Sequence, residues 1–253
     1  MKIITFGIAK GGTGKTLITA NVALALANRN KKVLLIDCDI GSKSLTYIFD
    51  VKPKYTLSEV INKKENIKKA IYPTKYNNID IILMGESLDD YVNLNIDLVD
   101  EMSKLDYDYI LIDAPATSTG IETYISLGLS DYFIPVIDYN ALSPSLQGAI
   151  NTLIIGKNYL ECNPAGFIIN NAGNIPESII KDIEKILGVE CIVTIPKLLV
   201  LEQAYEKKII PYKYSRDFGK LIDKIADKLE ELEDIKKRGL PEVLKKINEN
   251  ILF

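Results

Sequence analysis

A glycine-rich loop that carries two lysines lies near the start of the chain, at Lys10-Gly-Gly-Thr-Gly-Lys15-Thr16. Closely spaced glycines let a backbone turn tightly, so that successive N–H groups point inward and bind phosphate oxygens. A lysine at the end of such a loop reaches the terminal phosphates of a nucleoside triphosphate, and the hydroxyl after it binds Mg²⁺. We therefore expect Thr16 to bind the metal, and the nucleotide to contact Gly11, Gly12, Thr13, Gly14, Lys15, Thr16 and Leu17.

Three aspartates stand at the ends of two further apolar runs. Asp37 and Asp39 follow the run 33–36, and Asp113 follows the run 109–112. Residues two apart on an extended strand face the same side, so Asp37 and Asp39 can act on one ligand. Paired carboxylates beside a triphosphate suit contacts around Mg²⁺ and the positioning of a water molecule for hydrolysis.

The elements that carry these residues follow one another as alternating strands and helices. Apolar runs predict strands at 2–9, 33–37, 79–84, 109–113, 132–137, 166–170 and 190–194, with helical patterns between them. This alternation predicts an α/β fold with a doubly wound, mostly parallel sheet, helices on both faces and ligands at the carboxyl ends of the strands. The glycine loop and the aspartates all lie at such ends. Residues 52–78, which contain several lysines and two prolines, are interpreted as a polar excursion.

The glycine loop resembles the deviant Walker A motif of the MinD/ParA family of P-loop ATPases, and the resemblance covers about residues 2–215. In that family the first lysine crosses a dimer interface and touches the phosphates bound by the partner subunit. The resemblance therefore implies a catalytic role for Lys10 beside Lys15, with Asp39 orienting the attacking water. It also implies that Asp37 lies near the metal and that Asp113 is the Walker B carboxylate, which binds Mg²⁺ through water.

Two weaker marks of the same family concern the base of ATP. Asn170 matches the base-reading asparagine, and Pro196 ends an Ile-Pro pair whose backbone lines the base in the family. The sequence also departs from the family pattern in three places. Thr117 replaces a glycine of the second switch loop, Asn171 stands where MinD usually has arginine, and Leu198 replaces an aspartate.

Length and composition limit the fold and the compartment. The 253 residues fit one large domain, and 47% hydrophobic with 26% charged residues is ordinary for a soluble globular protein. No apolar run reaches the ~18–20 residues of a membrane span, and no signal segment precedes the first strand, so we expect a cytoplasmic protein. The absence of histidine excludes histidine catalysis. Cys38, Cys162 and Cys191 lie far apart, which argues against a disulfide or metal cluster within one chain.

The end of the chain differs in charge from the rest. We divide the chain into a P-loop ATPase domain, residues 1–234, and a tail, residues 235–253, whose apolar residues repeat at helical spacing. The tail has five basic and two acidic residues, a net charge of +3, and because the whole chain carries −3, residues 1–234 carry −6. A basic amphipathic helix, as in MinD, is typical of a reversible anchor on a membrane surface. The alternative is a helix that packs on its own domain or on a dimer partner.

Three functions follow as hypotheses. The first is a MinD-like ATPase switch in cell division or spatial positioning, which forms a homodimer with ATP and attaches to a membrane surface or a partner. It would be a peripheral protein on the inner face of the cell membrane and would need an unidentified activating protein. The second is a ParA-like ATPase for DNA or cargo segregation, which the acidic charge of residues 1–234 disfavours, because nucleic acid requires a basic surface. The third is a nucleotide-dependent adaptor or metallochaperone, although metal-delivering relatives use cysteine pairs that this chain lacks.

Overall fold

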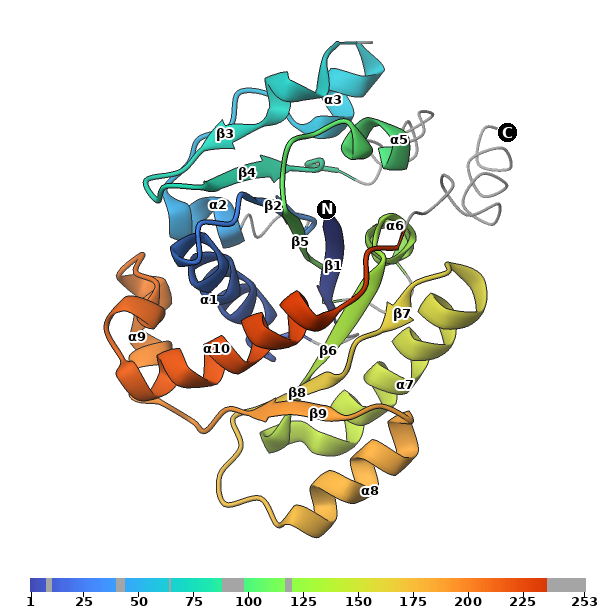
Figure 1. Ribbon diagram of the computed structural model, residues 1–253, viewed down its shortest axis with the longest axis vertical. Coiled ribbons are helices and arrows are strands. Elements are labelled where there is room, and N and C mark those ends of the chain that lie inside the picture. Colours follow the sequence, from blue (N-terminus) through green and yellow to red (C-terminus); the bar gives the residue numbers. More distant parts are fainter. Residues whose placement is uncertain (8–10, 40–43, 64, 88–97, 117–119, 236–253) are drawn as a thin grey trace.

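The computed structural model describes residues 1–7, 11–39, 44–63, 65–87, 98–116 and 120–235, and Figure 1 traces them in colour. These residues form a nine-stranded sheet in the order β3-β4-β2-β5-β1-β6-β8-β9, with β7 also paired to β6. All pairings are parallel except that of β3 with β4. The predicted doubly wound, mostly parallel sheet is confirmed. Its strands are β1 Lys2–Gly7, β2 Val33–Asp37, β3 Tyr72–Pro73, β4 Ile79–Leu83, β5 Tyr109–Asp113, β6 Tyr132–Asp138, β7 Asn163–Pro164, β8 Phe167–Asn170 and β9 Cys191–Thr194.

Helices cover both faces of this sheet, because its central strands are apolar on both sides. Leu35 of β2 lies in a core beneath α1 and α10, whereas its neighbours Leu34 and Ile36 lie in a second core beneath α3, α5 and α6. The helices are α1 Lys15–Asn28, α2 Ser44–Phe49, α3 Leu57–Asn62, α5 Leu98–Ser103, α6 Ile121–Leu129, α7 Leu142–Tyr159, α8 Glu177–Leu187, α9 Leu199–Glu206 and α10 Arg216–Glu231, with 3₁₀ turns η1 Ile67–Ala70, η2 Tyr139–Ala141 and η3 Pro211–Lys213.

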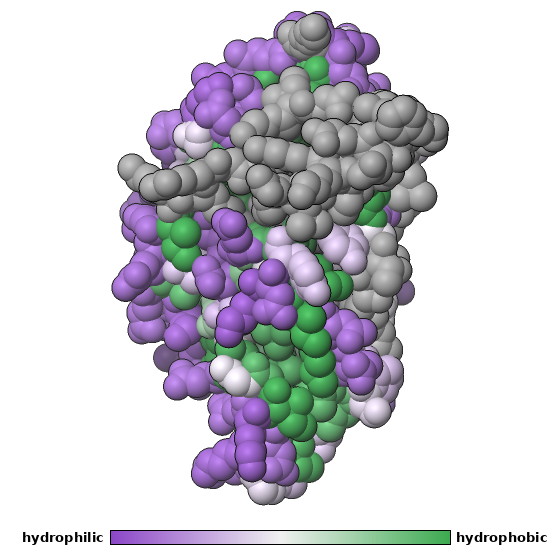
Figure 2. All heavy atoms as spheres, turned by 90° about the vertical axis from the view of Figure 1, so that its right-hand side faces the viewer, coloured by the Kyte–Doolittle hydropathy of each residue, from purple (hydrophilic) through white to green (hydrophobic). Residues whose placement is uncertain are grey.

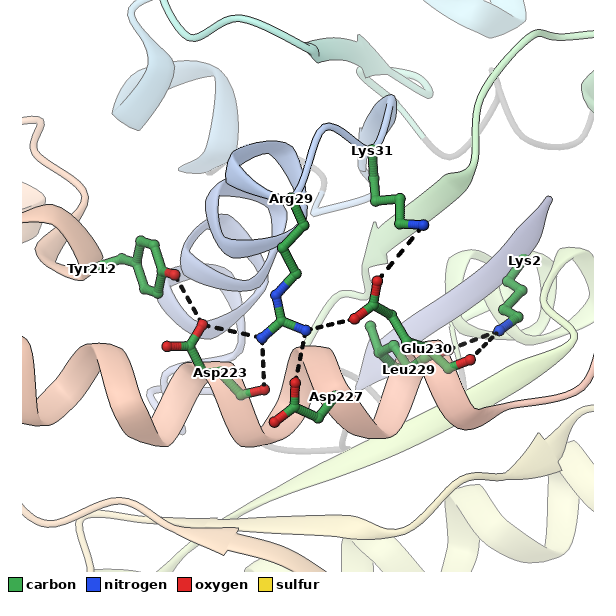
Figure 3. A network of polar contacts seen from close by, with 8 residues as sticks. All are labelled: Lys2, Arg29, Lys31, Tyr212, Asp223, Asp227, Leu229 and Glu230. Atoms are coloured by element: carbon green, nitrogen blue, oxygen red, sulfur yellow. Dashed lines mark hydrogen bonds and ion pairs between the residues drawn. The ribbon is translucent and has the colours of Figure 1, made fainter.

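The long helix α10 is fastened to the end of α1 by one arginine (Figure 3). Arg29 Nη1 donates to Asp227 Oδ1 at 2.7 Å and to Glu230 Oε2 at 2.6 Å, and its Nη2 donates to Asp223 Oδ1 at 3.2 Å. Lys2 of β1 adds a bond from its Nζ to the carbonyl oxygen of Glu230 at 3.0 Å. These hydrogen bonds therefore link helix α10 both to the amino end of the chain and to the end of α1.

The interpretation of residues 52–78 as a polar excursion is wrong. This segment contains α3, η1 and β3, and it buries Leu57, Val60 and Ile67 against the core. Thr56 starts α3 with a reciprocal capping box, in which the backbone N–H of Glu59 donates to the threonine hydroxyl. A helix of six residues or fewer completes too few turns for hydrophobic periodicity to reveal it.

On one side of the molecule, helix α7 exposes a surface with few charged residues. Helix α7 has a single charged residue, Lys157, and leaves Ile154 at 47% and Tyr159 at 57% exposed. Figure 2 shows hydrophobic side chains gathered over the lower half of that side, where α7 lies. Within the part of the chain that the structure describes, no helix combines the length and apolarity needed to cross a bilayer.

Candidate nucleotide-binding site

The glycine loop leads from β1 into α1 through two left-handed backbone positions. Gly12 has φ of 74° and Gly14, the N-cap of α1, has φ of 88°, a region that favours glycine. Lys15 is the first helical residue and is only 7% exposed. The free N–H groups and positive dipole end of α1 therefore point at the loop, which is the arrangement that binds phosphate. Lys10 lies outside the described residues.

Asp37 and Asp113 lie directly opposite each other at the ends of neighbouring strands β2 and β5. Both are fully buried. Asp37 accepts backbone N–H bonds from Asp39 at 3.2 Å and from Leu45 at 2.9 Å. Neither oxygen of Asp113 has a hydrogen bond of ordinary geometry. The two strands thus place one satisfied and one unsatisfied carboxylate side by side.

Burial and mutual repulsion change the ionisation of these groups. Burial raises the pKa of Asp113 to about 8, and the negative charge of Asp37 adds to the rise, while Thr16 and Lys15 oppose it. Burial also raises the pKa of Asp37 to about 6, against the backbone N–H groups that lower it. Burial lowers the pKa of Lys15, while Asp113 and Asp39 raise it. Asp113 and Asp39 therefore both act on the positive charge of Lys15.

The unsatisfied oxygens indicate what the site accommodates. A buried carboxylate without donors is costly, so the oxygens of Asp113 fit a cation, or water molecules held by one. The hydroxyl of Thr16 lies close enough to Asp113 to lower its pKa. Carboxylate and hydroxyl oxygens are the ligands that Mg²⁺ prefers. Thr16, Asp37 and Asp113 therefore suit the metal that accompanies a nucleoside triphosphate.

A depression of about 320 Å³ adjoins the phosphate loop. Its lining comes from the phosphate loop, from α1, from three asparagines and from three residues later in the chain. The lining residues are Gly12, Gly14, Leu17, Ile18, Asn140, Asn170, Asn171, Lys197, Leu201 and Phe218. A larger depression, of about 590 Å³, lies at the opposite ends of β2, β4 and β5, away from the loop and the aspartates. Of these two depressions, the smaller one is continuous with the phosphate loop, which makes it the candidate site for the nucleoside.

The predicted base contacts differ in detail from the structure. Asn170 lines the depression, but its Nδ2 donates to the carbonyl oxygen of Thr13 at 2.8 Å. Pro196 is exposed and does not line the depression, whereas the next residue, Lys197, does.

Several lining residues escaped the sequence analysis. Asn140 follows β6, which pairs with β1, so its approach to the loop depends on the sheet order. Phe218 comes from α10 and Leu201 from α9, and no local pattern connects either residue with a loop about 190 residues earlier. Thr117, the departure in the second switch loop, lies outside the described residues.

Comparisons with known proteins agree with this geometry. A family model described as an AAA domain matches residues 1–161. An uncharacterized ATP-binding protein of Methanocaldococcus jannaschii is 56% identical over 100% of this chain and 97% of its own length. The cell division ATPase MinD of Pyrococcus furiosus superposes with a TM-score of 0.76 at 26% identity, covering 92% of this chain and 99% of that one. The septum site-determining protein MinD of Pyrococcus horikoshii, complexed with Mg-ADP, also gives 0.76 at 26% identity, covering 94% and 99%.

Proposed function

Because the chain belongs to the MinD/ParA family of P-loop ATPases, we propose that it is an ATP-driven switch that pairs with a second copy of itself and separates after hydrolysis. ATP with Mg²⁺ occupies the site. The observation that carries this function is the pair Asp37 and Asp113 beside the phosphate loop, with both oxygens of Asp113 buried and without a hydrogen bond of ordinary geometry from the described residues. A site of this kind gains its compensating charge from Lys15 and from the metal that the nucleotide brings.

Each residue of the site has a separate role in ATP binding or hydrolysis. The backbone N–H groups of the loop and Lys15 bind the phosphates, and Thr16 and Asp113 would hold the metal, with Asp37 near it. Mg²⁺, when bound, would supply charge neutralisation to the phosphates. Asp39, half-buried beside Asp37, orients the attacking water. Lys10 reaches the phosphates held by the partner copy, in the manner of an arginine finger.

Sedimentation tests the dimer. Asp39→Ala is expected to bind ATP without hydrolysing it, so with ATP and Mg²⁺ it should sediment as a stable dimer. The same variant without nucleotide, and Lys15→Ala with nucleotide, serve as monomeric controls, because Lys15→Ala loses the phosphate contact. An Asp39→Ala protein that remains monomeric with ATP and Mg²⁺ would contradict the switch.

Phosphate release tests the trans role of Lys10. If Lys10 completes the partner's site, Lys10→Ala should slow ATP turnover by about 10³-fold or more, the scale seen when a charge-stabilising finger is removed. ATP affinity of the monomer should change little by comparison. Equal turnover in Lys10→Ala and wild type would remove the trans contact from the proposal.

The output of the switch is attachment to a membrane surface or to a protein partner, as part of cell division or spatial positioning. The support is the basic amphipathic pattern of residues 235–253 and the likeness to MinD structures. Dimerisation brings two tails together, and two weak anchors bind a surface far more strongly than one. We therefore place the protein in the cytoplasm and, in its ATP form, on the inner face of the cell membrane, with a further protein that stimulates hydrolysis.

A basic edge favours a second candidate, ParA-like binding to nucleic acid. Residues 207–216 include four basic and no acidic side chains. Lys75, from the turn before β4, donates to the carbonyl oxygen of Lys208 at 3.2 Å. The Nζ atoms of Lys75 and Lys213 lie 5.6 Å and 5.2 Å from the ring centre of Tyr76. Figure 1 places the β3–β4 turn and α9 on one side of the molecule. Such a concentration of lysine on an acidic chain suits a phosphate backbone.

Duplex binding distinguishes the two candidates. If this edge meets DNA, the ATP form should bind nonspecific duplex with a steep salt dependence, and changing Lys207 and Lys213 to alanine should weaken binding and lower the slope by about 2. Lys181→Ala and Lys185→Ala on α8 are the matched control. No binding at low salt would eliminate this candidate and leave the MinD-like output.

The metallochaperone alternative has little structural support. Cys38 and Cys162 are buried, and Cys191 is half-buried. Burial raises the pKa of Cys191 to about 11 and raises the pKa of Cys38 strongly, so neither thiol supplies a thiolate at neutral pH.

A further inference from the structure

Asn170 is held between the phosphate loop and the depression. It ends β8, beside Asp138 of β6, and is 6% exposed. Its Nδ2 donates to the carbonyl oxygen of Thr13 at 2.8 Å. Because a carbonyl can only accept, the amide nitrogen must face Thr13, and the oxygen is the end left over. That oxygen is buried and makes no hydrogen bond in the described structure.

The Thr13 carbonyl controls the direction of a loop N–H. Thr13 and Gly14 share one planar trans peptide, in which the C=O and the N–H point in opposite directions. A hydrogen bond that turns the carbonyl toward β8 therefore turns the Gly14 N–H away from β8. Gly14 is the N-cap of α1 and offers no side-chain bond of its own to hold this peptide. The bond from Asn170 supplies that restraint.

The fit between these residues is close. A Cβ on Gly14 would lie 2.4 Å from Asn170 Nδ2, so the asparagine approaches the loop over a position where only glycine fits. The neighbouring segments hold Asn170 in place. The next residue, Asn171, donates from Nδ2 to Asp138 Oδ1 at 3.0 Å, and the N–H of Ala172 donates to the carbonyl oxygen of Ile195 at 2.9 Å.

We propose that Asn170 is a positioning residue for the phosphate loop as well as a neighbour of the base. Its nitrogen orients the Thr13–Gly14 peptide, and its oxygen accepts from an amino group in the depression. One rigid amide thus links occupancy of the nucleoside side to the geometry of the phosphate side. This inference rests on the proposed function, because it assumes that the loop binds a triphosphate.

A ligand without a base separates the two roles. We would measure binding of magnesium tripolyphosphate to the full chain by calorimetry. Asn170→Ala is expected to weaken it by about three- to tenfold, the equivalent of one neutral hydrogen bond. Asn170→Asp should weaken it more, because a carboxylate oxygen replaces the donor that faces the Thr13 carbonyl. Asn151→Ala, which alters an exposed asparagine of α7 outside the lining of the depression, should leave tripolyphosphate affinity unchanged.

Amide exchange gives a second readout that needs no nucleotide. In Asn170→Ala the N–H groups of residues 12–16 should exchange faster than in wild type or Asn151→Ala, with thermal unfolding confirming that each variant is folded. Unchanged loop exchange together with unchanged tripolyphosphate affinity would overturn the inference, and Asn170 would then serve the base alone. If wild type binds neither ATP nor tripolyphosphate, the proposed function fails, while the exchange result still decides whether Asn170 restrains the loop.

Discussion

At the scale of single residues, Asp113 opposes folding of the nucleotide-free protein at neutral pH, because its buried oxygens lack donors. Its pKa is raised to about 8 in the folded chain, against about 4 for an unfolded aspartate. Between these values the folded state binds a proton that the unfolded state has lost. The associated stability is therefore fully present below about pH 4 and is lost as the pH rises through about 8. Asp37, whose pKa is about 6, acts in the same direction over a narrower range.

We predict that the free energy of unfolding of the nucleotide-free protein, measured with a chelator present, falls between about pH 4 and about pH 8. Asp113→Asn should flatten this fall and stabilise the protein at the alkaline end, since an amide carries no charge to bury. Asp182→Asn on the exposed face of α8 is the charge-matched control. A pH profile that is the same in Asp113→Asn and wild type would show that another group dominates.

The glycines of the loop allow a graded test. In Gly12→Ala nothing lies within 4 Å of the added Cβ, so the unfavourable φ is the only source of strain. This substitution should lower the free energy of unfolding by about 1–2 kcal/mol. Gly14→Ala should cost more and should impair ATP binding, because its Cβ would lie 2.4 Å from Asn170. Gly173→Ala has neither problem and should be close to neutral. Urea unfolding of the three variants checks the order, and equal losses at positions 12 and 14 would mean that Asn170 yields without cost.

At the scale of elements, the junction between α1 and α10 matters most, because α1 carries the phosphate loop and α10 contributes Phe218 to the depression. Arg29 is 26% exposed at its side chain and contacts three acidic residues of α10. Charge-assisted bonds of a forked guanidinium are stronger than single surface ion pairs, but solvent still weakens them.

Arg29→Ala is therefore expected to lower the free energy of unfolding by about 1–2 kcal/mol. Arg29→Lys should lie between it and wild type, since lysine keeps the charge but loses the fork. Arg216→Ala, an exposed arginine in the first turn of α10, should change stability by less than about 0.5 kcal/mol. Denaturant unfolding of the three variants decides, and an Arg29→Ala protein as stable as Arg216→Ala would show that apolar packing alone holds α10.

At the scale of the whole molecule, the last described residues, 233–235, contact the amino terminus and the rest of the domain. The amino terminus lies 3.7 Å from Asp234, the hydroxyl of Tyr132 donates to the carbonyl oxygen of Glu233 at 3.1 Å, and Ile235 packs against the core. The division that we propose falls after residue 234, and Ile235, the first residue of the tail, packs against the core in the described structure.

Removal of residues 236–253 is accordingly expected to leave thermal stability and ATP affinity within error of the full chain. Co-sedimentation of the ATP form with vesicles rich in anionic phospholipid should be lost, because the truncation removes the basic amphipathic segment. Zwitterionic vesicles and the ADP form are the controls, and both should bind weakly even with the full chain. Equal sedimentation of the truncated and full chains with anionic vesicles would contradict a membrane role for the tail.

The seven predicted strands required only local information. Strands such as β2 and β5 are continuous apolar runs because they are buried on both faces. Segments without such a run, including α3, were missed. Their burial comes from neighbours supplied by other parts of the chain.

By itself, the sequence determined the chemistry of the phosphate loop and the strand ends that carry aspartates, because loop conformation and strand burial depend on residue types a few positions apart. Only the tertiary structure decided that Asp37 and Asp113, 76 positions apart, lie directly opposite each other on neighbouring strands, since strand order and register are set by hydrogen bonding between distant segments. It also decided that Lys197 rather than Pro196 borders the depression, and that the amide of Asn170 turns its nitrogen to the loop. Burial, pKa and hydrogen-bond partners are properties of an assembled neighbourhood, and no local pattern contains them.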